Sequence, residues 1–193
     1  METLTLDTNV LNDWAWAEGR SAESRYGNDP AMRTKLIELF KQLKELRDDG
    51  VCELGITSQI FTDYEKDVGE LPNFIEEMIG PYVSYALPSI STFPMIFPFV
   101  FADEDEINAI MADVFPHSKP EHKKHKSNKK DAFQLYAHRV TKRDIFLTSD
   151  KRILSARQVL FSKWNIQVMT LDEYIAKHTL SLNPKSPPNH GFT

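Results

Sequence analysis

Near its N-terminus the chain reads Leu4-Thr5-Leu6-Asp7-Thr8-Asn9-Val10-Leu11, an apolar run that ends on an aspartate and continues into a helical pattern. The run is typical of a short buried strand, and the two small polar residues after the aspartate are types that begin helices. Ligands of open α/β sheets bind in the crevice at the carboxyl ends of the strands. We therefore expect Asp7 to lie at that edge of a sheet.

A second stretch, Ile145-Phe146-Leu147-Thr148-Ser149-Asp150, repeats this arrangement near the other end of the chain. Two parallel strands that present aspartates at one edge would form a site for a hard divalent cation. The alternative for each aspartate alone is a structural role, because aspartate is also a preferred helix N-cap. A third acid, Asp131, opens a helical pattern over 131–140 that leads directly into the second strand.

Taken in order, these segments resemble a PIN domain. The resemblance consists of the strand that ends in Asp7-Thr8-Asn9, an acid on a helix after Thr57-Ser58-Gln59-Ile60, a helix that starts at Asp131-Ala132, and Leu147-Thr148-Ser149-Asp150. It covers residues 3–67 and 131–172 and leaves 70–130 unmatched. PIN domains are largely metal-dependent ribonucleases and include the toxins of many bacterial toxin–antitoxin pairs. The resemblance implies that RNA is cut to leave a 5′-phosphate and a 3′-hydroxyl.

The resemblance also implies a site of four carboxylates, each both catalytic and metal-binding: Asp7, Asp63, Asp131 and Asp150. Clustered carboxylates repel one another, so such a site needs a cation. Mg²⁺ or Mn²⁺ fits, because both ions prefer oxygen ligands and keep several waters. Asn9 and Ser149 are the candidates for orienting those waters or the carboxylates, and capping the following helices is the alternative role of both.

The mid-chain acid is open between Asp63 and Glu65. The family usually has glutamate at this place, but counting from a helix start at Thr57 favours Asp63. Two residues along a helix correspond to a rotation of about 200°, so only one of the two side chains can point at the crevice. We expect Asp63 to be the site residue, with Glu65 as the alternative.

Charge is divided unevenly along the chain. The net charge is −5, but residues 1–115 carry 22 acidic and 8 basic side chains, whereas residues 116–193 carry 6 and 15. The basic part contains a low-apolar run that we expect to be a mobile loop in contact with RNA phosphates, through Lys119, Lys123, Lys124, Lys126, Lys129 and Lys130. A solvated loop without a ligand is the alternative. The three histidines of this run lack the spacing of a zinc site.

Residues 78–102 contain no charged side chain. Four prolines and several hydroxyl residues interrupt the segment, which argues against a membrane-spanning helix. We expect a strand at 82–87 followed by a buried, proline-kinked connection. The alternative is an exposed apolar surface over 82–101 that binds a protein partner or a second copy of the chain in a homo-oligomer.

Apolar strands that alternate with amphipathic helices predict an α/β protein, with three α/β/α layers around a mostly parallel sheet. We expect one domain over 1–180, with an insertion at about 70–130 and a disordered tail over 181–193. The single cysteine, Cys52, excludes an internal disulfide, and its apolar surroundings predict a buried thiol. Without a visible secretory signal, the expected location is the cytoplasm.

Three functions compete on these patterns. A metal-dependent endoribonuclease agrees best with the order and spacing of the acids. A PIN-like module that binds RNA or protein without catalysis is the second, and the identity of the mid-chain acid discriminates between the two. The third is an aspartyl-phosphate phosphohydrolase of the haloacid dehalogenase type. Such enzymes have a second aspartate two residues after the first, where this chain has Asn9, and the difference argues against that class.

Overall fold

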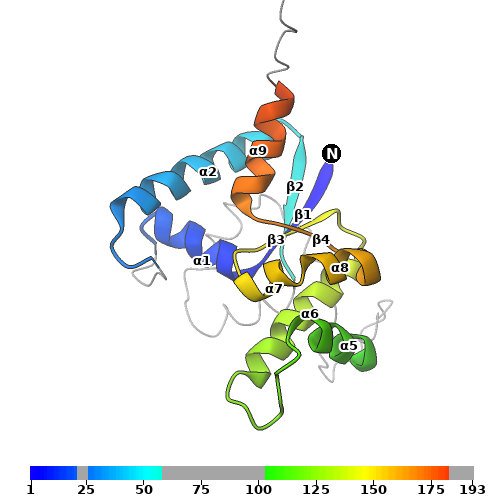
Figure 1. The fold of residues 1–193 in the computed structure, drawn as a ribbon. Helices are drawn as coiled ribbons and strands as arrows, with labels where there is room; N and C mark the ends of the chain where they lie inside the picture. The colour runs from blue at the N-terminus through cyan, green and yellow to red at the C-terminus, as the bar shows by residue number, and fades with distance from the viewer. Residues whose placement is uncertain (21–25, 58–102, 183–193) are drawn as a thin grey trace, which may run out of the picture.

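The computed structural model describes residues 1–20, 26–57 and 103–182. Within these residues the centre is a sheet of four parallel strands in the order β2-β1-β3-β4 (Figure 1). The strands are β1 (Glu2–Leu6), β2 (Cys52–Gly55), β3 (Ile145–Leu147) and β4 (Gln167–Met169). Leu4 of β1 pairs with a residue on each neighbouring strand, Leu54 of β2 and Ile145 of β3. The predicted parallel sheet is confirmed.

Helices cover both faces of this sheet (Figure 1). One face is covered by α1 (Thr8–Ala17), α2 (Pro30–Asp48) and α9 (Leu171–Leu182). The other face is covered by α5 (Glu104–Val114), α6 (His125–Val140) and α8 (Arg157–Trp164). A short helix, α7 (Lys151–Ser155), follows β3. The fold is the three-layer α/β/α arrangement that the sequence predicts.

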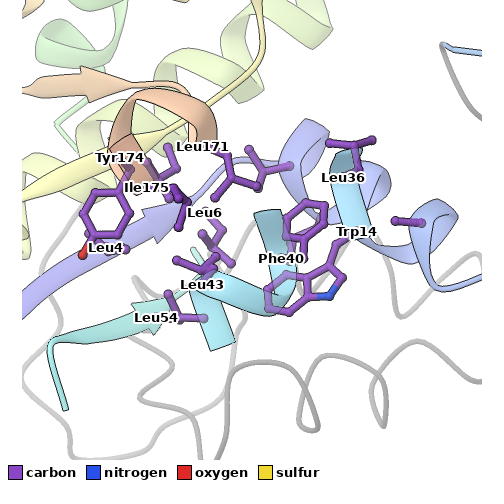
Figure 2. Close-up of a cluster of buried hydrophobic side chains, with 14 of the residues drawn as sticks. Leu4, Leu6, Trp14, Leu36, Phe40, Leu43, Leu54, Leu171, Tyr174 and Ile175 are labelled. Carbon is purple, nitrogen blue, oxygen red and sulfur yellow. The ribbon is translucent and has the colours of Figure 1, made fainter. Parts of the chain in front are cut away.

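The core beneath α1, α2 and α9 is built on Leu4 and Leu6 of the central strand (Figure 2). Trp14 of α1 stacks on Phe40 of α2, with ring centroids 4.7 Å apart and planes at 8°. Such aromatic pairs stabilise a core beyond the area that they bury. This packing holds α1 against the sheet, and it therefore also holds the residues at the start of α1.

The second core lies on the opposite face of the sheet. Side chains along a strand point alternately to its two faces. Accordingly, Ile145 and Leu147 of β3 belong to the first core, whereas Phe146 packs with α5, α6 and α8 in the second. All three side chains are buried, which explains why the strand reads as a continuous apolar run.

Three helix boundaries differ from the predictions. α6 begins at His125 instead of Asp131, so the end of the expected lysine-rich loop is helical. Lysine is a good helix former, and 125–130 contains no glycine or proline to interrupt a helix. The sequence pattern of 151–162 predicts one continuous helix, but the structure divides this segment at Ala156 into α7 and α8. α9 continues to Leu182, so the first two residues of the tail expected over 181–193 are helical, and 183–193 lie outside the described residues.

Other predictions agree with the structure or fall outside its described residues. Cys52 is buried, as expected. Three predictions concern residues outside the described part of the chain: the predicted strand at 82–87, the charge-free segment 78–102 and the predicted helix with Asp63 and Glu65. In the part of the chain that is described, no helix is long and apolar enough to cross a membrane.

Arg143, just before β3, links the three neighbouring strands from a buried position. Its Nη1 donates to the carbonyl oxygen of Leu4 and its Nη2 to Oε1 of Glu53, both at 2.6 Å. The guanidinium lies over Gly55, where an added Cβ would be 2.0 Å from Nη1. Glycine at this position of β2 therefore leaves room for the guanidinium, which would have to move to admit a side chain.

We expect Gly55→Ala to lower the free energy of unfolding by about 1–3 kcal/mol, the usual cost of overpacking. The added methyl group would push the guanidinium of Arg143 away from its two acceptors. Urea unfolding measures the decrease. In an Arg143→Ala background the same substitution should cost little, since the clash is removed. Equal decreases in the two backgrounds would contradict this account of Gly55.

Candidate functional site

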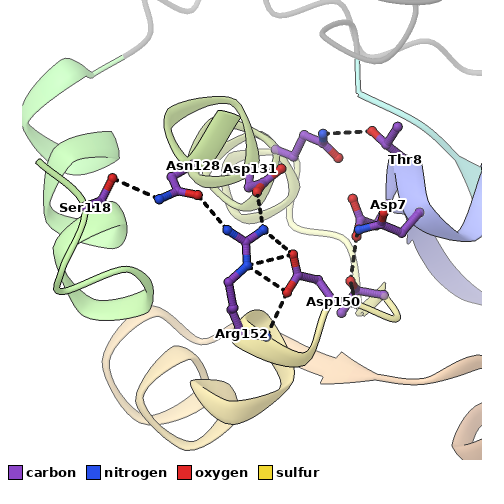
Figure 3. A network of polar contacts seen from close by, with 10 residues as sticks. Asp7, Thr8, Ser118, Asn128, Asp131, Asp150 and Arg152 are labelled. Carbon is purple, nitrogen blue, oxygen red and sulfur yellow. Dashed lines mark hydrogen bonds and ion pairs between the residues drawn. The ribbon is translucent and has the colours of Figure 1, made fainter. Parts of the chain in front are cut away.

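The carboxyl ends of β1 and β3 lie side by side and bring Asp7 and Asp150 to one edge of the sheet (Figure 3). The backbone N–H of Asp7 donates to the carbonyl oxygen of Leu147 at 2.9 Å, which joins the two strand ends directly. Asp131 reaches the same edge from α6. Three of the four predicted carboxylates are therefore brought together by segments that are far apart in the sequence.

Asp7 is the most buried of these acids, with 2% of its surface exposed. Its Oδ2 accepts hydrogen bonds from Thr148 Oγ1 at 2.6 Å and from Asn9 Nδ2 at 3.2 Å. Asp7 occupies the N-cap position of α1, but its side chain makes no capping hydrogen bond. Burial raises the pKa of Asp7, and the charge of Asp150 raises it further, against the effect of the two hydrogen bonds. Helix capping thus does not account for this carboxylate.

Asp150 does cap a helix. Its Oδ1 accepts the backbone N–H of Arg152 at 2.8 Å, which satisfies a donor in the first turn of α7. The guanidinium of Arg152 contacts both carboxylate oxygens as well. Burial alone would raise the pKa of Asp150, but the hydrogen bonds and charge of Arg152 outweigh burial and lower it. Asp150 therefore loses its proton more readily than an ordinary aspartate, through the contact with Arg152.

The pKa of Asp131 is shifted in the opposite direction to that of Asp150. Burial raises its pKa to about 7, and the neighbouring charges of Asp7 and Asp150 act in the same direction. The guanidinium of Arg152, whose Nη2 is 3.2 Å from Oδ2 of Asp131, only partly offsets these effects. Asp131 lies inside α6 and not at its start, so it has no capping role. The site thus holds more negative charge than its surroundings neutralise.

Arg152 is the centre of the polar network (Figure 3). Besides the two aspartates, it donates from Nη1 to Oδ1 of Asn128 at 2.6 Å. The Nδ2 of Asn128 in turn donates to Oγ of Ser118 at 2.9 Å. The guanidinium carbon also lies 4.8 Å from the centre of the Phe115 ring, a cation–π geometry. The position of this guanidinium is therefore determined from several sides.

The site fits a divalent cation in its donor chemistry, but its side chains do not form a complete set of ligands. Among residues 1–20, 26–57 and 103–182, no three His, Cys, Asp or Glu side chains are placed to hold one ion. The guanidinium of Arg152 contacts Asp131 and Asp150 and supplies positive charge there. The carboxylate oxygens that converge on this edge from β1, β3 and α6 are the ligands that Mg²⁺ and Mn²⁺ prefer.

The two residues expected to orient carboxylates differ in where they point. Asn9 contacts Asp7, as its expected role requires. Ser149 donates instead to Oδ2 of Asp13, at 3.3 Å, further along α1. Asp13 is 7% exposed and was not among the predicted residues. The sequence contains a signal for it only in retrospect, as an acid on an otherwise apolar stretch of helix.

The predicted phosphate-binding lysines are not all alike. Lys129 pairs with Glu104 of α5, with Nζ and Oε2 2.7 Å apart. The others differ in exposure: Lys119, Lys123, Lys124 and Lys126 are exposed, and Lys130 is half-buried. Lys124 immediately precedes α6, so its charge lies at the positive end of the helix dipole. The run thus divides into an exposed group before and at the start of α6 and a group inside α6.

No protein-family model matches this chain, and neither the curated proteins nor the solved structures contain a match. The chemistry of the candidate site is therefore inferred from its own residues and contacts. The two side chains that contact the aspartates most closely, Thr148 and Arg152, were not predicted either. Both flank Asp150 in the sequence, but neither has a periodicity or spacing that would single it out.

We expect Asp131→Asn to stabilise the protein at pH 8 and to have little effect at pH 4. Between its unfolded value near 4 and its folded value of about 7, Asp131 keeps its proton only in the folded state, so stability falls as the pH rises through this window. At about 1.4 kcal/mol per pKa unit, the gain at pH 8 should be about 2–4 kcal/mol. Urea unfolding at the two pH values measures it.

Asp49→Asn is the matched control for this experiment. Asp49 is an exposed aspartate at the C-terminal end of α2, just before β2 begins and therefore at the sheet edge opposite the candidate site. Because Asp49 lies away from the candidate site, its substitution should not reproduce the stabilisation expected for Asp131→Asn at pH 8. A stabilisation by Asp131→Asn that is equal at pH 4 and pH 8 would contradict the raised pKa.

Proposed function

We propose that the protein is a metal-dependent endoribonuclease whose site contains Asp7, Asp131 and Asp150, together with an acid from the 58–102 segment. Asp63 is the preferred fourth acid and Glu65 the alternative. The observation that carries the proposal is Asp7: a buried carboxylate without a capping role, directed into an edge where two further aspartates converge. Burying an ionised carboxylate costs free energy unless a cation or another partner compensates its charge.

Mg²⁺ or Mn²⁺ would be held by the aspartates and would polarise the phosphoryl group and activate a water for hydrolysis. The chain supplies the positioning. Thr148 and Asn9 hold Oδ2 of Asp7 and so determine the orientation of that carboxylate. The backbone hydrogen bond between Asp7 and Leu147 holds the two strand ends together, so that the acids they carry approach the same phosphate.

RNA is the proposed substrate for two reasons. The resemblance to PIN domains implies it, and the basic character of residues 116–193 suits a polyanion that approaches an acidic centre. Lys124, exposed and immediately before α6, borders the same space as Asn128 and Arg152. Hydrolysis would leave a 5′-phosphate and a 3′-hydroxyl, as in the family that the sequence resembles.

One observation favours a second candidate, a PIN-like module that binds RNA or protein without catalysis. Arg152 already neutralises Asp150 and part of Asp131, which is the task that a metal ion would have in an active enzyme. Metal binding to the wild-type protein therefore discriminates between the two candidates.

We expect Mg²⁺- or Mn²⁺-dependent cleavage of single-stranded RNA, and we expect Asp7→Asn or Asp150→Asn to reduce the rate about 10²-fold or more, because each removes a charge that acts on the reacting groups. Asn9→Ala should reduce it about tenfold, as a residue that only orients a ligand. Gel analysis of cleaved RNA measures these rates, and Asp49→Asn serves as the control. Cleavage that persists in EDTA, or in Asp7→Asn, would refute the proposal.

Metal binding has a readout that does not need activity. Ligands that bind only the folded state raise the melting temperature. We expect Mn²⁺ to raise the melting temperature of the wild type but not of Asp7→Asn. The increase should be larger for Arg152→Gln, because the guanidinium no longer competes for Asp131 and Asp150. If Mn²⁺ stabilises neither the wild type nor Arg152→Gln, the module without catalysis is the better account.

A further inference from the structure

A hollow of about 310 Å³ opens beside the candidate site, on the far side of Arg152 from Asp7. It lies between the connection from α5 to α6 and the start of α7. The polar side chains that line it come from the connection, from α6 and from α7: His117, Ser118, His122, Lys124, Asn128 and Arg152. We call this feature the basic hollow.

The lining of the basic hollow has the chemistry of an anion site. Lys124 and Arg152 carry positive charge, and the hollow has no aspartate or glutamate among its described lining residues. Lys124 also precedes the first residue of α6, whose first turn contains no acid, so the positive end of a 16-residue helix adds to the field. His117 and His122 contribute further ring nitrogens that can bind phosphate oxygens.

The donors at the inner wall of the basic hollow are held in place before any ligand binds. Asn128 is 7% exposed and bridges Ser118 and Arg152 with hydrogen bonds of 2.9 and 2.6 Å. Arg152 in turn rests on the ring of Phe115, which also lines the hollow. A guanidinium restrained in this way loses little conformational freedom when it binds an anion. Its Nε and Nη2 donate to the aspartates, whereas Nη1 carries two hydrogens, of which Asn128 takes one and the other can donate to a phosphate oxygen.

The same guanidinium borders both the basic hollow and the aspartates. A phosphate that binds Arg152 from the hollow is therefore next to the carboxylates that would act on the neighbouring phosphodiester. The hollow also has an apolar wall, formed by Val114, Phe115 and Pro116, that suits a sugar or a base. Its volume is at the lower end of the range of about 300–1,000 Å³ that is typical of small-molecule sites.

We propose that the basic hollow binds one nucleotide of a single-stranded RNA, with its phosphate on Lys124 and Arg152 and its sugar or base against the apolar wall at Pro116, the exposed part of that wall. The choice of RNA as the ligand rests on the proposed function. The nucleotide lies beside the bond to be cut and holds the strand in register with Asp7, Asp131 and Asp150.

The test is the affinity of the full chain for a fluorescent single-stranded RNA in EDTA, measured by polarisation over a series of salt concentrations. The test variant is the double substitution His122→Ala and Lys124→Ala, in which both side chains are exposed and neither caps α6. Lys41→Ala is the control, because Lys41 is an exposed lysine of α2 on the opposite face of the sheet.

We expect the double variant to bind about tenfold more weakly, since a charge-assisted hydrogen bond to phosphate contributes about this much. The log–log salt slope should become flatter by about 0.7 for each phosphate that the protein no longer neutralises. The control should change neither quantity. Equal effects of the double variant and the control would overturn the proposal, as would undetectable binding of RNA to the wild type.

An acidic peptide is the competing ligand, and polyglutamate tests it. If polyglutamate competes with RNA for the basic hollow at equal charge concentration, the hollow is not a nucleotide site and the proposal fails. The outcome is separable from that of the cleavage assay. RNA binding that depends on the hollow, without metal-dependent cleavage, would leave the hollow as an RNA site and refute the nuclease. Metal-dependent cleavage that is unaffected by the double variant would leave the nuclease standing and refute the hollow as an RNA site.

Discussion

The parallel pairing of β1 with β3 sets the position of every other part of the candidate site. It joins Leu4 to Ile145 and continues past the strand ends in the hydrogen bond from Asp7 to Leu147. Because both strands run in the same direction, their carboxyl ends meet at one edge, and with them the aspartates that follow. Arg143 strengthens the same pairing from the other end of β3, by its bonds to β1 and β2.

At the sheet edge that this pairing creates, acidic side chains lie close together and partly out of water, which is electrostatically unfavourable. Asp7 is buried and Asp131 holds its proton up to a pH of about 7, because burial and the neighbouring acids both disfavour its charge. If stability alone were selected, amide side chains in place of Asp7 and Asp131 would be favoured, because they avoid the repulsion and the burial of charge. The guanidinium of Arg152 relieves part of the repulsion and connects the acids to the basic hollow. Because Arg152 contacts both the aspartates and the basic hollow, the arrangement suits a negatively charged substrate.

Several elements were predictable from local patterns. The strand around Leu4 reads as apolar residues that end on an acid, and Asp29 before Pro30 begins α2 where the helix signals place it. The start of α6 was not predictable in this way. Asp131 has the side chain of a capping residue, but the helix begins six residues earlier without a side-chain cap. The six added residues contain no apolar side chain, and the one that is buried, Asn128, is held by hydrogen bonds to Ser118 and Arg152 that local signals do not reveal.

For the candidate site, the residue types and their order could be read from the sequence: an acid after each of two apolar strands and a third acid before the second strand. The burial of β3 on both faces could be read there too, since its three residues are all apolar. Which acid is buried, which caps a helix and which keeps its proton became clear only in the folded chain. Those differences follow from the distances of the three aspartates to Thr148, to Arg152 and to one another. The contact of Asp7 with Thr148 spans 141 residues and that of Asp131 with Arg152 spans 21, so both depend on strand pairing and helix packing, which no local pattern encodes.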